Sequence, residues 1–178
     1  EEPDEYPDPR IGVIIEAQSK QVTVTDNGIG IPESVFSSFL TPIFSYEKAI
    51  GKSRVYKVVG ATYLAYGFVS LKFHSKTLDG FKGAFKFEGG RAWAMSDDTS
   101  NPRPKTQSID IFNNELESYP SGSSFTIRLS GLPSENTNAL DHFANSAEKW
   151  RALLRLTTPA GIVNFDIHEY EVQMLSLI

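Results

Sequence analysis

Between residues 68 and 130 the sequence places several strand-like segments one after another, with turn residues rather than helical patterns between them. The clearest segment is "SSFTIRLS", in which Phe125, Ile127 and Leu129 alternate with polar residues. Alternation with a period of two indicates a strand with one buried face. Successive strands without intervening helices favour an antiparallel sheet. The other strands predicted here are residues 68–75, "GAFKFEG", "RAWAMS" and "SIDIFN".

Two strands and two helices are predicted before residue 68. "RIGVIIEA" and "KQVTVTD" are rich in Val, Ile and Thr and are joined at residues 18–20, which predicts a hairpin. Pro32 favours a short helix directly after this hairpin. A second helix is expected to open at Gly60 and to stop at Gly67.

The C-terminal part is predicted to contain one more helix and one more strand. The helix begins around Asn138, and its apolar residues have the spacing of one helical face. These residues are Leu140, Phe143, Ala147, Trp150 and Leu154. "GIVNFDIHEYEVQMLSLI" then has strand character and stops without a polar tail, so we expect a fragment of a longer polypeptide.

Composition limits the class of protein. With 178 residues, 40% hydrophobic and 22% charged, the chain is expected to form a folded domain. A net charge of −5 argues against direct binding to nucleic acid, and the absence of Cys excludes disulfides and Cys-ligated metals. No stretch approaches the roughly 20 apolar residues that cross a bilayer. We therefore expect a cytoplasmic protein with no membrane partner.

Several motifs fail on their spacing. "GKS" at residues 51–53 does not complete a P-loop, because Tyr46 stands where that motif needs Gly. Gly28 and Gly30 do not begin a dinucleotide-binding fingerprint, because Glu33 occupies its third glycine position. The three histidines lie far apart without partners at ligand spacing, so we predict no metal site on them. The acidic pairs 97–98 and 115–117 are predicted to be solvated loops without a catalytic role.

The segment "VTDNGIGIP" at residues 24–32 is the strongest candidate for a site. It is a strand that ends in turn residues, since Asp, Asn and Gly all favour turns. It could also form a ligand platform, with the Asp26 carboxylate at its edge and little bulk at Gly28 and Gly30. A carboxylate there can accept a hydrogen bond from the amine of adenine, whereas guanine presents a carbonyl oxygen. This segment alone does not decide between the two readings.

Three segments in fixed order, "DNGIGIP", "VVGATYLAYGF" and "SGSSFTIRLS", together resemble the GHKL superfamily. This superfamily includes gyrase, HSP90-class chaperones, histidine kinases and MutL, and the MORC-type branch looks nearest. The resemblance implies an α+β two-layer sandwich of the Bergerat type, with a mostly antiparallel mixed sheet. It also implies an ATP-binding domain over residues 1–135, while residues 136–178 pack on it or start the next domain.

The resemblance implies which residues would contact ATP. The residue matching Asp26 contacts adenine, Ser124 or its neighbour Ser123 matches a Thr that joins the same water network, and Asn27 is assigned to the turn only. Basic residues 48–57 resemble the family's ATP lid. The implied contact residues are Asp26, Gly28, Gly30, Ile31, Lys57, Gly60, Ala61, Thr62 and Ser124.

Two departures from the family pattern concern catalysis. The glycine expected just before Gly60 is replaced by Val58 or Val59, which could weaken phosphate binding. The family takes its general-base Glu and its Mg²⁺-binding Asn from a helix upstream of the first strand, and we expect both upstream of Glu1. We therefore predict a GHKL-type ATPase with ATP and Mg²⁺ as cofactors, slow hydrolysis and a switch or homodimer in a larger protein. A MORC-like role would make it nuclear, and the alternative is an inactive nucleotide-binding or scaffolding domain.

Overall fold

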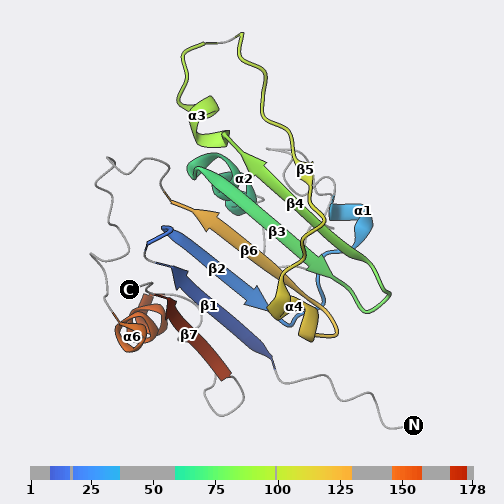
Figure 1. The fold of residues 1–178 in the computed structure, drawn as a ribbon, viewed down its shortest axis with the longest axis vertical. Helices are drawn as coiled ribbons and strands as arrows, with labels where there is room; N and C mark the ends of the chain where they lie inside the picture. The colour runs from blue at the N-terminus through green and yellow to red at the C-terminus, as the bar shows by residue number, and fades with distance from the viewer. Residues whose placement is uncertain are drawn as a thin grey trace, which may run out of the picture.

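The fold is built on one seven-stranded sheet with the order β5-β4-β3-β6-β2-β1-β7 (Figure 1). A computed structural model of the chain describes residues 9–16, 18–36, 59–98, 100–129, 146–157 and 169–175. The strands are β1 (Arg10–Glu16), β2 (Gln21–Asp26), β3 (Ser70–Lys76), β4 (Lys82–Glu88), β5 (Gln107–Ser108), β6 (Gly122–Arg128) and β7 (Glu169–Leu175). Neighbouring strands are antiparallel except β1 and β7, which are parallel.

The described helices are short, and the two faces of the sheet each carry some of them. They are α1 (Glu33–Phe36), α2 (Val59–Gly67), α3 (Gly90–Ala94), α4 (Asn114–Ser118) and α6 (Ala147–Thr157). Helices combined with a mostly antiparallel sheet make this an α+β fold, so the predicted fold class is confirmed.

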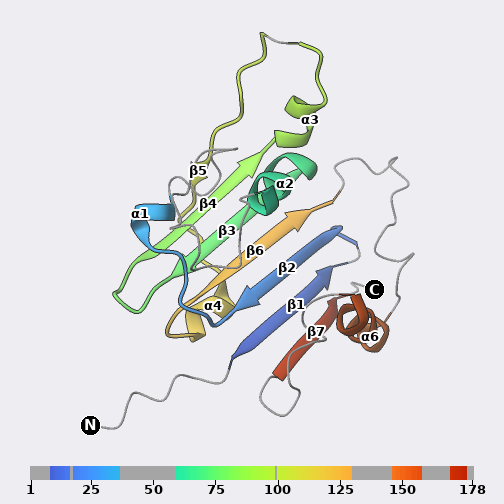
Figure 2. The same cartoon turned by 180° about the vertical axis from the view of Figure 1, so that it is seen from behind.

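One face of the sheet, here called the helix face, packs against α1, α2 and α6 (Figure 2). Alternate residues of each strand point to this face, and they are apolar along most of its area. Over β3 and β4 the buried residues are Ala65, Leu71, Phe73, Phe85 and Phe87. Over β1, Trp150 of α6 packs with Ile15. The strand register aligns Ile15 with Val22 and thus with the apolar rows of β6 and β3, which forms one continuous face.

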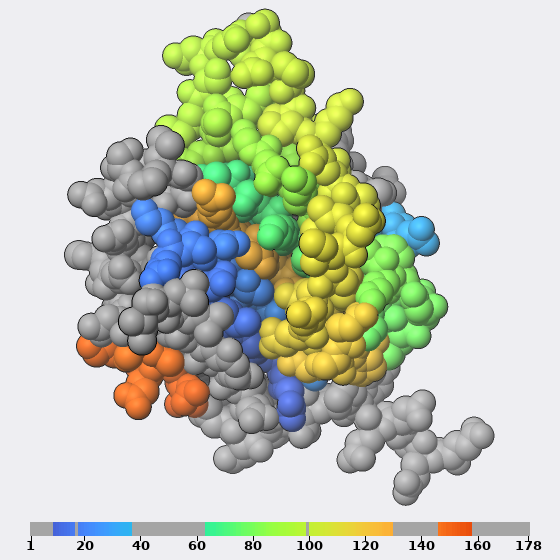
Figure 3. Space-filling view, viewed as in Figure 1, coloured from blue at the N-terminus to red at the C-terminus, as the bar shows by residue number. Residues whose placement is uncertain are grey.

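The opposite face is more polar and is covered in part by α4 and the segment before it. Its buried residues include Thr25, His74 and Ser124. In Figure 3 the yellow segment around residues 105–120 lies across β3 and β4, beside the blue strands β1 and β2. Leu116 of α4 is fully buried there, so the short helix contributes a core side chain to an otherwise polar surface.

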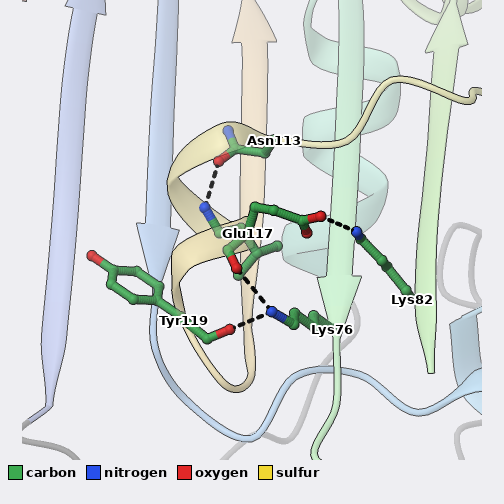
Figure 4. A network of polar contacts seen from close by, with 6 residues as sticks. Lys76, Lys82, Asn113, Glu117 and Tyr119 are labelled. Carbon is green, nitrogen blue, oxygen red and sulfur yellow. Dashed lines mark hydrogen bonds and ion pairs between the residues drawn. The ribbon is translucent and has the colours of Figure 1, made fainter. Parts of the chain in front are cut away.

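Polar contacts hold α4 on this face (Figure 4). Asn113 caps the helix by accepting a hydrogen bond from the Leu116 N–H at 2.8 Å. Lys76 Nζ donates to the carbonyl oxygens of Glu117 at 2.9 Å and Tyr119 at 2.6 Å. Lys82 forms an ion pair with Glu117, and this contact is the main cause that lowers the pKa of the Glu117 carboxyl.

Most of the predicted elements are confirmed. The hairpin of β1 and β2 is present, and α2 ends at Gly67 as expected. The strand predicted for residues 68–75 is β3, and "GAFKFEG" and "SSFTIRLS" supply β4 and β6. β7 confirms the strand character near the C-terminus. The start of the helix predicted from Asn138 lies outside the described residues, and its later part is α6.

Two predicted strands are wrong. "RAWAMS" forms helix α3, because Gly89 adopts a left-handed conformation with φ of 76° and turns the chain away from the sheet. "SIDIFN" pairs only briefly with β4 through β5, and Ile111 is then 81% exposed. The chain leaves the sheet at this point, since Asn113 starts α4. The prediction of a solvated loop at residues 115–117 is therefore wrong as well.

The helices that the structure describes include none with the length and hydrophobicity of a membrane span.

Candidate functional site

The candidate site begins where β2 ends, at Asp26. The strand register places Asp26 between Ile11 of β1 and Ser123 of β6. Partners in a register share a face, and Asp26 is two residues from Val24 and four from Val22, so its side chain lies on the helix face. The residue is half-buried. The sheet therefore presents a carboxylate at the end of its apolar face.

The two polar residues of the turn have separate tasks. Oδ1 of Asp26 accepts a hydrogen bond from the Gly28 N–H at 2.9 Å, which closes an Asx turn. Oδ1 of Asn27 accepts from the Arg10 N–H at 2.7 Å, and the Asn27 N–H donates back to the Arg10 carbonyl at 3.3 Å. Asn27 thus attaches the start of β1 to the turn, while the Gly28 N–H holds the Asp26 carboxylate.

Gly30 is required by the path of the chain after the turn. Its φ is +73°, and a Cβ there would lie 2.2 Å from the carbonyl oxygen of Lys76. A side chain at this position would be both strained and in collision with backbone. Gly28 is close to the carboxylate itself, because its Cβ would stand 2.8 Å from Asp26 Oδ1. The two glycines therefore let the loop lie directly against the strand ends.

Ser75 is a residue of this site that the sequence interpretation missed. It is fully buried on β3, opposite Ser123 in the register. Its hydroxyl accepts from the Ile31 N–H at 2.6 Å and donates to the Ile31 carbonyl at 3.0 Å. Ser75 thus ties the glycine loop to the central strands. A lone Ser inside a strand pattern carries no signal for this role, because its partner is 44 residues away.

The loop is anchored again at its far end. Phe36 of α1 stacks on Phe73 with ring centroids 5.2 Å apart, and it makes edge contacts with Phe81 and Phe85. Such aromatic pairs stabilise their arrangement beyond simple burial. Residues 26–36 are therefore held at the strand end, at Ser75 and in the aromatic core.

The two serines considered for the site lie on opposite faces of β6. Ser123 is opposite Asp26 in the register and shares the helix face with it. Ser124 is opposite Thr25, and the two hydroxyl oxygens are 3.1 Å apart on the other face. Ser123 and not Ser124 is thus beside Asp26. The alternation of side chains along a strand separates the two.

The second glycine segment forms the start of α2. Gly60, Ala61 and Thr62 belong to its first turn, and α2 packs against the helix face, on which Asp26 also lies. Lys57 and the other basic residues of 48–57 lie outside the described residues. The helix that begins with these residues thus packs on the face that carries Asp26.

Among the described residues, His74 and Asp98 make structural contacts. His74 is buried under Phe112, and burial together with the charge of Lys72 lowers its pKa to about 4. His142 and His168 lie outside the described residues. Asp98 accepts hydrogen bonds from Ser100, as expected for a loop residue. Within the ranges that the structure describes, no group of three His, Cys, Asp or Glu residues could hold a metal ion.

Comparison with solved structures agrees with this architecture. No family model and no curated protein matches the sequence. The chain is similar to the ATPase region of topoisomerase II from Saccharomyces cerevisiae, at a TM-score of 0.56 and 16% identity. The structure of that region bound to ICRF-187 (dexrazoxane) matches equally well. Each match covers 94% of this chain and 42% of the solved chain.

The sheet order, the helix face and this structural similarity together assign the fold, while the identity is too low to assign a particular family member. The chain has the fold of the topoisomerase II ATPase region, an α+β fold with a mostly antiparallel sheet, as its sequence predicted.

Proposed function

We propose that this chain binds ATP on the helix face of its sheet, with adenine against Asp26. The observation that carries the proposal is the half-buried carboxylate at the end of β2, held by the Gly28 N–H at 2.9 Å beside a loop with little side-chain bulk. The shared fold with an ATPase region supports it.

Asp26 suits adenine for a simple chemical reason. An ionised carboxylate only accepts hydrogen bonds, and the exocyclic amine of adenine donates them. Guanine offers a carbonyl oxygen at the same position, so the two acceptors would repel. The carboxylate therefore selects the base, and the glycines at 28 and 30 leave room for a flat ring.

Ser123 takes the part in this proposal that the resemblance assigned first to Ser124. It lies across from Asp26 on the helix face, so its hydroxyl can complete a water network around the adenine amine. Ser124 is engaged with Thr25 on the opposite face and acts as a structural residue.

The phosphates are proposed to lie at the start of α2. Free N–H groups in the first turn of a helix, together with the positive end of its dipole, favour an anion. Gly60, Ala61 and Thr62 supply these groups, and Ile31 and Lys57 complete the proposed contacts. Val59, the first residue of the helix, stands at the position before Gly60 where the family pattern has glycine.

Hydrolysis is a separate part of the proposal. Bound Mg²⁺ would supply charge neutralisation on the phosphates, and a Glu would activate water. The resemblance implies that the Glu and an Mg²⁺-binding Asn lie upstream of Glu1. The described residues before Asp26 form strands β1 and β2, and this observation supports a second candidate, an ATP-binding domain that does not hydrolyse. In either case we propose that nucleotide acts as a switch for dimerisation or for other parts of a longer chain.

Calorimetric titration with the non-hydrolysable analogue AMP-PNP tests the adenine assignment. Asp26→Asn should weaken binding by about tenfold or more, since a hydrogen bond to a charged group is lost. The control Asp97→Asn removes an equal charge from an exposed loop and should change nothing. Asp26→Asn should also lose the preference of the wild type for AMP-PNP over GMP-PNP. Equal affinities of wild type and Asp26→Asn would contradict the proposal.

The adjacent serines provide a matched pair for the geometry. Ser123→Ala should weaken AMP-PNP binding about three- to tenfold, as expected for one hydrogen bond, while Ser124→Ala should leave it unchanged. A loss of affinity in Ser124→Ala alone would contradict the placement of adenine on the helix face.

Phosphate release tests the proposed hydrolysis. Steady-state release of phosphate from ATP distinguishes an ATPase from a binding domain, because both bind AMP-PNP and only the first releases phosphate.

Light scattering tests the proposed dimerisation. The mass of the protein is measured with and without AMP-PNP, and an unchanged mass at saturation would contradict the homodimer.

A further inference from the structure

A cavity lies at the end of the sheet away from Asp26. It has a volume of about 450 Å³, within the size range of small-molecule sites. Its lining residues come from the start of β3, from the ends of β4 and β6, and from α3. Figure 1 shows that these parts of the chain lie at the same end of the sheet. The lining residues used below are Val69, Glu88, Arg91, Ala92, Met95 and Arg128.

This cavity is distinct from the proposed ATP site. Arg128 is five residues along β6 from Ser123, which corresponds to about 17 Å of strand. Arg128 and Glu88 flank Ser70 in the register, on the face that carries Ser124 and not on the helix face. In Figure 3 the orange end of β6 reaches the surface of this face beside the green α3 region.

The walls of the cavity carry positive charge in a chain whose net charge is −5. Arg91 enters from α3 and Arg128 from β6, so two guanidinium groups approach from different elements. Nη1 of Arg91 donates to the Leu129 carbonyl at 3.5 Å, which directs this group toward the end of β6. Among the described lining residues the carboxylate is that of Glu88, which is paired with Lys86 at 3.1 Å. The described lining residues therefore carry more positive than negative charge.

The rest of the lining is apolar. Val69, Ala92 and Met95 supply aliphatic and thioether surface, and Met95 is 73% exposed. Met adapts its shape to flat or irregular groups. A ligand that satisfies both parts of the lining has an oxyanion and a small apolar body.

The wall that carries Arg91 is fixed on the fold. Gly90 is buried so tightly that a Cβ would lie 2.2 Å from the Ala65 carbonyl of α2. The Gly89 N–H donates to the Val69 carbonyl at 3.2 Å, and the Trp93 N–H donates to the Gly89 carbonyl at 2.9 Å. A preorganised wall lowers the ordering cost of binding.

We propose that this cavity binds a small organic oxyanion, a carboxylate or a phosphate ester with an apolar body, through Arg91 and Arg128. The planar guanidinium matches both oxyanions in two-point geometry. The apolar body lies against Met95 and Val69. The proposal is independent of ATP binding at Asp26.

Titration calorimetry of the 178-residue chain tests it with three probes: phenyl phosphate, benzoate and inorganic phosphate. Saturable binding of one aromatic probe, tighter than inorganic phosphate, is the expected result. The ratio between phenyl phosphate and benzoate identifies which oxyanion the cavity prefers. Absence of saturable binding for all three probes would overturn the proposal.

Variants locate the binding. Arg91→Gln and Arg128→Gln should each weaken the tighter aromatic probe about tenfold. Arg151→Gln, an exposed arginine on α6, and Asp26→Asn should leave it unchanged. An equal loss in Arg151→Gln, or a loss in Asp26→Asn, would overturn the assignment. Circular dichroism checks folding, and Arg128→Gln decides the matter if Arg91→Gln fails to fold.

Discussion

At the scale of single residues, the loop after β2 depends on the absence of side chains. Gly30 combines a positive φ with a close approach to the Lys76 carbonyl, whereas Gly80 has a φ of +93° and open space around it. A side chain at Gly80 would thus meet backbone strain alone, whereas one at Gly30 would meet both strain and a steric collision.

Gly30→Ala should therefore destabilise the chain more than Gly80→Ala does. Strain alone costs about 1–3 kcal/mol, and the collision at Gly30 should add about 1 kcal/mol or more. Chemical denaturation measures both variants. Equal losses would mean that the loop moves away from β3 without cost, against the tight packing described above.

His74 predicts a pH dependence of stability. Its pKa is about 4 in the folded chain, because it is buried and because Lys72 is positive, and an exposed histidine titrates near 6.5. The unfolded chain therefore binds the proton first, so stability falls as pH drops from about 6.5 to 4, by up to about 3 kcal/mol.

Denaturation curves between pH 4 and 7 measure this dependence. His74→Leu should remove it, because the leucine has no proton to bind. Lys72→Gln should reduce it only slightly, because burial is the larger cause. A slope that persists in His74→Leu would assign the effect to other groups.

At the scale of elements, α4 is a five-residue helix held by its cap and by one buried side chain. A helix this short has little stability of its own. Its place on the sheet thus depends on the Asn113 cap, on Leu116 and on the contacts from Lys76 and Lys82.

Asn113→Ala should cost about 1 kcal/mol of stability, the usual value of a lost cap. Asn114→Ala is the matched control, since that side chain is exposed and makes no capping bond, and it should be close to neutral. Comparable losses in both variants would mean that the cap contributes nothing specific.

At the scale of the whole molecule, one sheet joins two apolar clusters. The cluster under α2 and the cluster under α6 lie on the same face, and β7 extends the sheet beside β1. We propose on this basis that α6 and β7, the described parts of residues 136–178, belong to one folding unit with the first 135 residues.

Trp150→Ala tests this unit. It should lower stability by about 3–5 kcal/mol, because a large buried ring is removed, and the whole transition should shift. Leu156→Ala, at an 85% exposed position, should be neutral. Unfolding followed by circular dichroism at several wavelengths should remain a single transition. A separate early transition in Trp150→Ala would instead indicate an independent C-terminal part.

The sequence by itself determined the hairpin, β3, β4 and β6, because period-two alternation and turn residues are local signals. It also predicted that a strand ends at Asp26 and that a turn follows, since turn chemistry is encoded within a few residues. The tertiary structure decided what depends on distant partners. Examples are the Ser75 bond to Ile31, the placement of Ser123 rather than Ser124 beside Asp26, and the helical form of "RAWAMS". A local pattern shows that successive side chains of a strand alternate between the two faces of a sheet. Only the register with neighbouring strands shows which residues share a face with Asp26.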